Sequence, residues 1–340
     1  MTFRVLIPDP KIDDPALFQD PDGVLAFDLV PVNAVADLPD VTLETCDAFC
    51  MFTVMPMDRA VIERMGRCRL IVRAGVGFDN VDLKAAADHG IPVANVPDYG
   101  INEVADHALA LLLHFTRSIG RSSRLLRADP AAGWGFRHAI FNRRTFGRQA
   151  GIVGLGRIGS AMARRLQGLG MHVVAYDPYL PSGMELALDA TRVGSLGELL
   201  AATDIVSLHV PLTDETRNMI DAGAVAAMRP GTILINTSRG PVVDFDAVHD
   251  GMKHGPIQCA GLDVMPVEPL DGGNRLVKAW LGHEDWIEDR LVLTPHVAFY
   301  SPDSIDDMRT KAIDLIGDYL SGRPLRNWVN GHLLATADRR

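Results

Sequence analysis

Four side chains capable of acid, base or charge chemistry follow predicted buried strands in the second half of the chain. Arg239 comes after "LINTS", Asp263 ends "CAGLD" with Glu268 five residues later, and His296 ends "VLTPH". In open parallel sheets, ligands gather outside the carboxyl ends of the strands. These side chains can therefore converge on one ligand although they are distant in sequence.

Together, these residue types suit a 2-oxo acid. An arginine binds carboxylate and oxo oxygens through its planar fork and stays charged at any working pH. A histidine donates a proton to the oxo oxygen as a hydride arrives and takes it back in the reverse direction, and a nearby glutamate favours the imidazolium. On these grounds Arg239 is a candidate substrate clamp, and His296, with Glu268 as a candidate neighbour, is a candidate acid–base group. Taken alone, Arg239 also fits an arginine that bends into solvent where a strand ends.

A glycine-rich turn indicates the cofactor. In "GIVGLGRIGSAMARRLQ", Gly154, Gly156 and Gly159 form G-x-G-x-x-G between an apolar strand and a helix, where backbone amides can receive a pyrophosphate. The next strand, "MHVVAYD", ends at Asp177, where a carboxylate accepts hydrogen bonds from ribose hydroxyls. Residues 178–180 carry no cation for a 2′-phosphate, so NAD is favoured over NADP. The glycines taken alone leave open a simple tight turn or an S-adenosylmethionine-dependent methyltransferase.

The elements that must position these residues are alternating strands and helices. Short apolar runs such as "FRVLIP", "LIVRAG" and "IPVANV" alternate with helical patterns in the first third, and the alternation restarts at residue 149. This pattern is typical of parallel sheets covered by helices. We predict an α/β protein with two doubly wound parallel-sheet domains, a long helix from residue 101, a connecting arm over 127–147 and a final helix near the C-terminus.

The composition of the chain limits which kinds of partner and which cellular compartment we expect. The 340 residues carry a net charge of −10, which argues against nucleic acid as a main partner. The four cysteines at 46, 50, 68 and 259 include no Cys-x-x-Cys pair, which fits reduced thiols in a cytoplasmic protein and no metal site. We read no signal peptide and no apolar run long enough to span a membrane.

The chain also resembles a known family, the D-isomer-specific 2-hydroxyacid dehydrogenases. The resemblance runs in family order through "RAGVGFDNVDLKAAADHGIPVANVP", "VADHALALLL", "GIVGLGRIG", "YDP", "SLHVPLTDETRNMID", "LINTSRGPVVD", "GLDVMPVEP" and "TPH". It implies a flavodoxin-like substrate domain, residues 1–101 with 299–340, into which a Rossmann NAD-binding domain, residues 102–298, is inserted across a hinge. It also implies a homodimer and a small 2-oxo or 2-hydroxy acid as the substrate, with no role for a membrane.

Site residues follow from the resemblance motif by motif. It implies that Arg239 is the substrate clamp, that Glu268 and His296 are the catalytic pair, and that backbone amides near Val76 and Gly77 hold the substrate carboxylate. The implied cofactor contacts are, beside the three glycines and His296: Arg157 and Ile158 at the pyrophosphate, Asp177 at the ribose, His209, Val210, Pro211 and Thr216 on the adenine side, Asp263 at the nicotinamide amide, and Thr237 and Ser238.

Departures from the family pattern bear on the substrate and on the function. "TPHVAFYSPDS" resembles the branch of the C-terminal-binding proteins, with Phe299 at the position of their tryptophan. Phe299 either lines the substrate pocket or packs beside the hinge. An NAD(H)-sensing regulatory protein and a D-3-phosphoglycerate dehydrogenase are therefore the alternatives to a general 2-oxo acid reductase. We expect the long segment 269–295 to be an exposed surface insertion (an excursion from the domain) rather than a loop near the active site.

Overall fold

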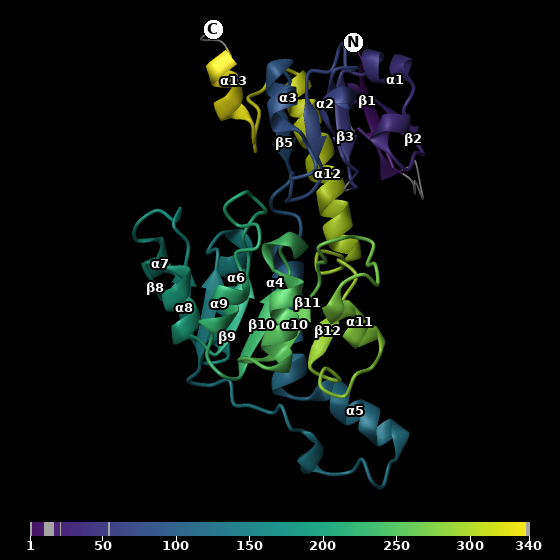
Figure 1. The fold of residues 1–340 in the computed structure, drawn as a ribbon. Coiled ribbons are helices and arrows are strands. Elements are labelled where there is room, and N and C mark those ends of the chain that lie inside the picture. Colours follow the sequence, from purple (N-terminus) through teal and green to yellow (C-terminus); the bar gives the residue numbers. More distant parts are fainter. Residues whose placement is uncertain (1, 10–16, 21, 54, 338–340) are drawn as a thin grey trace. The chain divides into compact units, whose positions relative to one another are not determined.

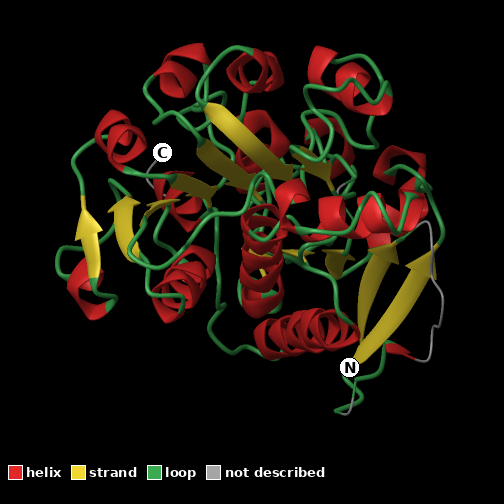
Figure 2. Ribbon diagram, turned by 90° about the horizontal axis from the view of Figure 1, so that it is seen from below, coloured by secondary structure: helices red, strands yellow, loops and turns green. Residues whose placement is uncertain are grey.

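The computed structural model describes residues 2–9, 17–20, 22–53 and 55–337. The chain divides into two compact units, which we describe separately. The first unit comprises Met1–Gly100 with Ser301–Arg340, and the second comprises Ile101–Tyr300. Strands and helices alternate along the chain. Figure 2 draws the strands in yellow and the helices in red.

The first unit is built on a five-stranded parallel sheet of order β2-β1-β3-β4-β5. This strand order is the flavodoxin-like one, as predicted. The strands are β1 (Phe3–Pro8), β2 (Leu25–Val30), β3 (Ala48–Met51), β4 (Ile71–Arg73) and β5 (Val93–Asn95).

Helices cover both faces of this sheet because alternate strand residues point to opposite sides. Leu6, Phe49 and Ile71 pack against residues of α1 (Asp40–Thr45), α2 (Arg59–Ile62) and α3 (Leu83–Asp88). Val5, Ile7 and Val72 pack against α12 (Pro302–Leu320), which brings the C-terminal part of the chain into the first unit. α12 begins with a capping box between Ser301 and Ser304, and the last helix, α13 (Gly331–Ala337), contacts α3.

The second unit contains a seven-stranded parallel sheet of order β12-β11-β10-β9-β6-β7-β8. Its strands are β6 (Gln149–Val153), β7 (His172–Tyr176), β8 (Ala190–Arg192), β9 (Ile205–Leu208), β10 (Thr232–Asn236), β11 (Ile257–Leu262) and β12 (Leu291–Leu293). Six of them have the Rossmann order and β12 extends the edge, which confirms the predicted fold class. The strand order reverses between β6 and β9, and this reversal creates a ligand-binding crevice at their carboxyl ends. The short strand β8 was not predicted.

Two helical layers cover this second sheet (Figure 1). α4 (Ile101–Thr116) and α6 (Arg157–Gly168) pack on one face. On the other face lie α8 (Leu196–Ala202), α9 (Ala222–Ala226), α10 (Phe245–Lys253) and α11 (Arg275–Leu281), while α7 (Met184–Ala187) precedes β8. α11 belongs to the segment expected to be an exposed excursion. Its Leu276, Val277 and Ala279 are buried against the apolar cluster of α10, so this segment is in part a packed helix.

An arm leaves the second sheet after α4. It begins with α5 (Ile119–Ala128), which buries none of its residues, and continues through a short 3-10 helix, Phe136–His138, before it returns to β6. Trp134, Phe136 and Phe146 on the arm are 79%, 88% and 74% exposed. No helix in the described part of the chain combines the length and the apolar character that a membrane span requires.

Candidate functional site

The glycine loop after β6 leaves room for a phosphate group. Gly154 has φ +87°, and a Cβ there would lie 2.6 Å from the carbonyl oxygen of His209. A Cβ on Gly159 would lie 2.0 Å from the carbonyl oxygen of Gly154. A Cβ on Gly156, the N-cap of α6, would meet nothing within 4 Å. Close packing thus requires glycine at positions 154 and 159. Gly156 has no side chain to fill the space in front of the N-terminus of α6, whose first two residues are Arg157 and Ile158. This cradle fits a dinucleotide pyrophosphate.

Asp177 is held beside this loop. Its Oδ2 accepts a hydrogen bond from the amide of Leu155 at 2.9 Å, and its Oδ1 accepts one from the amide of Tyr179 at 3.0 Å. Arg192, on β8, donates to the carbonyl oxygens of Asp177 and Leu180, at 2.9 Å each. These contacts fix the position of the carboxylate, and its expected contact with the ribose stays a prediction. Arg192, which the sequence motifs did not indicate, holds the loop through its backbone carbonyl oxygens.

The residues expected on the adenine side follow β9. His209 shares a hydrogen bond with the hydroxyl of Ser207 at 2.9 Å, and burial lowers the pKa of His209 to about 4. The ring is therefore neutral near pH 7 and cannot serve there as a general acid. Val210 and Pro211 continue the same loop, and the hydroxyl of Thr216 donates to the carbonyl oxygen of Pro211 at 2.6 Å.

A buried asparagine shapes the turn after β10. Oδ1 of Asn236 accepts hydrogen bonds from the amide and the hydroxyl of Ser238, at 3.0 and 2.7 Å, while its Nδ2 donates to the carbonyl oxygen of Arg239 at 2.9 Å. The hydroxyl of Thr237 is buried and has no hydrogen-bond partner among the described residues. An orphaned buried hydroxyl at the end of a central Rossmann strand fits a bound cofactor that would supply its partner.

Arg239 is half-buried at this turn. Its guanidinium donates to the carbonyl oxygen of Ser238 at 2.8 Å. The next residue, Gly240, allows the turn to approach the strand that follows, since a Cβ there would lie 1.9 Å from the carbonyl oxygen of Met265. The approach brings the positive charge of Arg239 close enough to act on Glu268.

His296 and Glu268 form a hydrogen-bonded pair. Nδ1 of His296 lies 2.7 Å from Oε2 of Glu268, and both side chains are 30% exposed. Oε1 of Glu268 accepts from the amide of Met265 at 2.9 Å. Burial raises the pKa of Glu268, but the hydrogen bonds from His296 and Met265 and the charges of His296 and Arg239 outweigh burial, so its pKa lies below the ordinary value. Phe299 packs its ring edge-on to His296, with centroids 6.0 Å apart.

Asp263 holds the turn that carries the histidine. The carboxylate is fully buried and accepts three hydrogen bonds, from the hydroxyl of Thr294 at 2.6 Å and from the amides of Val297 and Ala298 at 3.0 and 2.9 Å. Nε2 of His107, from α4, lies 3.1 Å from the same hydroxyl. Asp263 thus organises the His296 turn, a role that the strand-end pattern did not indicate. Its expected contact with the nicotinamide amide stays a prediction.

The predicted carboxylate loop lies in the first unit, after β4. Gly75 has φ +155°, and a Cβ there would collide with the side chain of Arg73. The side-chain amide of Asn95 donates to the carbonyl oxygen of Val76 at 2.7 Å. Among the described residues, the backbone amides of Val76 and Gly77 donate no hydrogen bond. The loop therefore presents two donors suited to an anion.

Comparison with known proteins identifies the family. Residues 109–298 match the family described as "D-isomer specific 2-hydroxyacid dehydrogenase, NAD binding domain". The chain belongs to this family. It is 35% identical over 288 residues to glyoxylate reductase of Korarchaeum cryptofilum, which covers 85% of this chain and 84% of that protein.

Other members of the family are similar over different lengths. D-3-phosphoglycerate dehydrogenase of Mycobacterium leprae is 35% identical over 284 residues, which are 84% of this chain and 51% of that protein. The chain therefore spans about half the length of this relative. The crystal structure of D-lactate dehydrogenase from Aquifex aeolicus complexed with NAD and lactic acid has a TM-score of 0.80 and 28% identity, and covers 94% of this chain and 96% of that chain.

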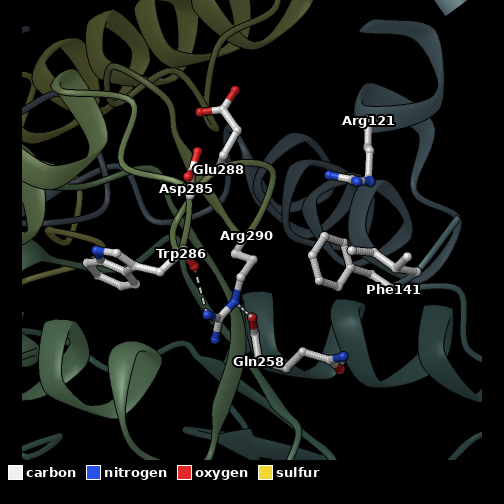
Figure 3. A pocket seen from close by; sticks show the side chains of 8 residues that line it. Arg121, Phe141, Gln258, Asp285, Trp286, Glu288 and Arg290 are labelled. Atoms are coloured by element: carbon white, nitrogen blue, oxygen red, sulfur yellow. Dashed lines mark hydrogen bonds between the residues drawn. The ribbon is translucent and has the colours of Figure 1, made fainter. Parts of the chain in front are cut away.

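A separate cavity of about 550 Å³ lies in the second unit, and Figure 3 shows the side chains that line it. Its lining includes Gln258 and Arg290, at the starts of β11 and β12, and Phe141 of the arm. Arg290 donates to the carbonyl oxygens of Gln258 and Trp286, at 2.8 Å each. Glu268 and His296 instead come after the ends of β11 and β12, and Arg239 comes after the end of β10, so this cavity is not part of the candidate site.

Proposed function

We propose that this protein is an NAD-dependent oxidoreductase that interconverts a small 2-oxo acid and its D-2-hydroxy acid. The observation that carries the proposal is the 2.7 Å hydrogen bond between His296 and Glu268, placed in a family of NAD-binding 2-hydroxyacid dehydrogenases. A histidine oriented by a carboxylate is a typical proton donor and acceptor at a carbonyl carbon that is being reduced.

In this proposal, His296, Glu268 and Arg239 have different roles in the reaction. Because Nδ1 of His296 faces Glu268, its Nε2 is the atom that gives a proton to the oxo oxygen during reduction and removes it during oxidation. The negative charge of Glu268 stabilises the imidazolium before the proton is given. Arg239 binds the substrate carboxylate and polarises the oxo group.

The cofactor would be held by the residues of the Rossmann crevice. The amides at the start of α6 would bind the pyrophosphate, Asp177 would accept hydrogen bonds from the ribose, and the orphaned hydroxyl of Thr237 would gain a partner. Bound NAD accepts or supplies the hydride. In the second unit, Phe299 would favour an apolar substrate side chain beside His296. We propose separately that the amides of Val76 and Gly77 in the first unit bind a carboxylate group.

The test is NADH oxidation with a panel of 2-oxo acids that includes glyoxylate, hydroxypyruvate, pyruvate and phenylpyruvate. We expect turnover with at least one acid, a strong fall in kcat/KM for His296→Asn, and a higher KM with lower kcat for Arg239→Ala. If the protein binds NADH yet oxidises none with any acid, the catalytic proposal is wrong. An unchanged kcat/KM in Arg239→Ala would remove this residue from the site.

D-3-phosphoglycerate oxidation is the second candidate, supported by the 35% identity to the phosphoglycerate dehydrogenase of Mycobacterium leprae. Adding 3-phosphohydroxypyruvate to the panel separates the two, since a preference for the phosphorylated acid would select this candidate. The "HVAFYS" segment after the catalytic histidine supports a third, an NAD(H)-sensing regulator. A partner protein retained only in the presence of NADH, with no turnover in the panel, would select the regulator.

We further propose that the protein is a homodimer that uses its arm. The arm exposes Trp134, Phe136, Ile140 and Phe146 within 13 residues of sequence, and such grouped apolar side chains mark association surfaces. Sedimentation should show a dimer that the double variant Trp134→Ser/Phe136→Ser converts to a monomer. Leu186→Ser, equally exposed on α7, is the matched control. A wild-type monomer at micromolar concentration would contradict the proposal.

A further inference from the structure

Two thiols of the first unit lie side by side although they are 22 residues apart. Cys46 follows α1 and Cys68 precedes β4, and the amide of Arg69 donates to the carbonyl oxygen of Asp47 at 2.9 Å, which joins the two segments one residue after each cysteine. The register of the neighbouring strands β3 and β4, in which Phe49 pairs with Ile71, places Cys46 opposite Cys68 three positions earlier. Both side chains belong to the apolar cluster on one face of the sheet.

The other two cysteines lack such a neighbour. Cys50 belongs to the apolar cluster on the opposite face of the same sheet, and Cys259 is in the second unit. Burial raises the pKa of each of these two thiols to about 12. The protein therefore contains one thiol pair and two isolated buried thiols, all of them free.

We propose that Cys46 and Cys68 are an oxidation site at which a hydroperoxide converts the two thiols to a reversible disulfide. The Cys46 thiolate attacks one peroxide oxygen, forming a sulfenic acid and releasing water or an alcohol. The Cys68 sulfur then attacks the sulfenic sulfur and displaces water. Two thiols lose two protons and two electrons, and the hydroperoxide is reduced by the same two electrons. A dithiol reductant reverses the change.

The surroundings assign different tasks to the two sulfurs. The hydrogen bond from Cys68 lowers the pKa of Cys46 against the effect of burial, and the same bond together with burial raises the pKa of Cys68. Because the thiolate is the nucleophile, Cys46 is the atom that reacts first. Cys46 and Cys68 are 1% and 8% exposed, so a small hydroperoxide suits this site better than a protein oxidant.

The disulfide would tie together the entries of β3 and β4. Each thiol already contacts a backbone carbonyl, Cys46 that of Leu43 and Cys68 that of Leu70, at 3.3 Å each, which limits the freedom of both side chains before they react. Neighbouring parallel strands are about 4.8 Å apart, and a disulfide needs Cα atoms about 4.4 to 6.8 Å apart. The candidate anion loop at Val76 and Gly77 lies at the other end of β4. Oxidation should therefore stabilise the first unit and leave that loop unchanged.

The test treats the full-length protein with hydrogen peroxide under native conditions. Free thiols are then alkylated, and a non-reducing digest is analysed by mass spectrometry. We expect a linked peptide pair containing Cys46 and Cys68, with Cys50 and Cys259 recovered as thiols. The oxidised protein should unfold at a temperature higher by roughly 5 °C, and dithiothreitol should remove this shift. Cys46→Ser and Cys68→Ser should each lose the linked peptide and the shift, while Cys50→Ser and Cys259→Ser should keep both.

Three results would overturn the proposal. One is full recovery of Cys46 and Cys68 as alkylated thiols after peroxide treatment. Another is a linkage between Cys46 and a different cysteine. The third is modification of all four cysteines at one rate, which would show that the oxidant reacts with unfolded chains. Since none of these readouts uses NADH turnover, failure here is distinguishable from failure of the proposed enzymatic function.

Discussion

Replacing Glu268 by glutamine tests the acid–base pair with the smallest change in shape. The new side-chain amide would keep an oxygen that accepts from the amide of Met265, which Glu268 now binds at 2.9 Å. It would lose the negative charge opposite Nδ1 of His296, now 2.7 Å away. Glu268→Gln therefore removes the charge-assisted bond and little of the packing.

The size of the effect follows from that bond. A hydrogen bond to a charged group contributes about 1.5 to 3 kcal/mol, and about 1.4 kcal/mol corresponds to a tenfold rate change. If Glu268 stabilises the imidazolium by this amount, kcat/KM for 2-oxo acid reduction should fall about 10- to 150-fold in Glu268→Gln. The variant should bind NADH like the wild type, because the carboxylate is assigned to the histidine and not to the cofactor.

The pH dependence provides a second readout. The pKa of Glu268 is lowered in the folded protein, so its charge stabilises the fold at pH values above the unfolded pKa, about 4.3. This stabilisation is lost as the pH falls through the lower, folded pKa. The difference in unfolding free energy between wild type and Glu268→Gln should therefore be constant near neutral pH and shrink under acid conditions, as measured by urea unfolding.

The matched control is Glu288→Gln. Glu288 lies 3.4 Å from His283 and 3.7 Å from Arg124 at the separate cavity of the same unit, so the control removes a histidine-paired carboxylate away from the candidate site. It should leave kcat/KM and its pH profile unchanged. Equal kcat/KM for Glu268→Gln and the wild type across the pH range would refute the reasoning.

Three further predictions concern the scaffold of the site. Gly159→Ala should lower the unfolding free energy by about 1 to 3 kcal/mol and weaken NADH binding in a fluorescence titration, because its Cβ would lie 2.0 Å from a backbone oxygen. Gly197→Ala, in open space on α8, should instead stabilise the protein by about 0.5 kcal/mol in urea unfolding; a loss of stability there would contradict the steric argument. Asp263→Asn should cost about 1 to 3 kcal/mol and lower kcat, because an amide replaces one of the oxygens that hold the His296 turn; wild-type kcat would exclude this positioning role.

Much of the architecture follows from local features of the sequence. Apolar runs separated by helical patterns are sufficient to predict parallel strands, and they predicted both sheets. The glycine fingerprint is similarly local in sequence, and Gly159 meets a steric demand within its own strand–turn–helix unit, whereas Gly154 is also needed for close packing against His209 after β9. β8 was missed because three residues with one buried position carry almost no periodic signal.

Contacts between distant segments could not be predicted in the same way. The strand-end position of Asp263 did not indicate that its carboxylate also holds the His296 turn, through three hydrogen bonds with residues about 31 to 35 positions later. Arg192 reaches the loop of Asp177 from the unpredicted strand β8. Such hydrogen-bond partners are distant in sequence, and they meet only because the loops between the strands fold in a particular way. A pattern of neighbouring residues does not contain that information.

The sequence by itself therefore determined the two sheets, the glycine cradle and the types of side chain at the strand ends, because each depends on neighbouring residues. Only the tertiary structure shows how the side chains are brought together. The 2.7 Å approach of His296 to Glu268 depends on the pairing of β11 with β12, and the approach of Cys46 to Cys68 depends on the pairing of β3 with β4. Strand pairing is a property of the whole sheet and of the loops that close it.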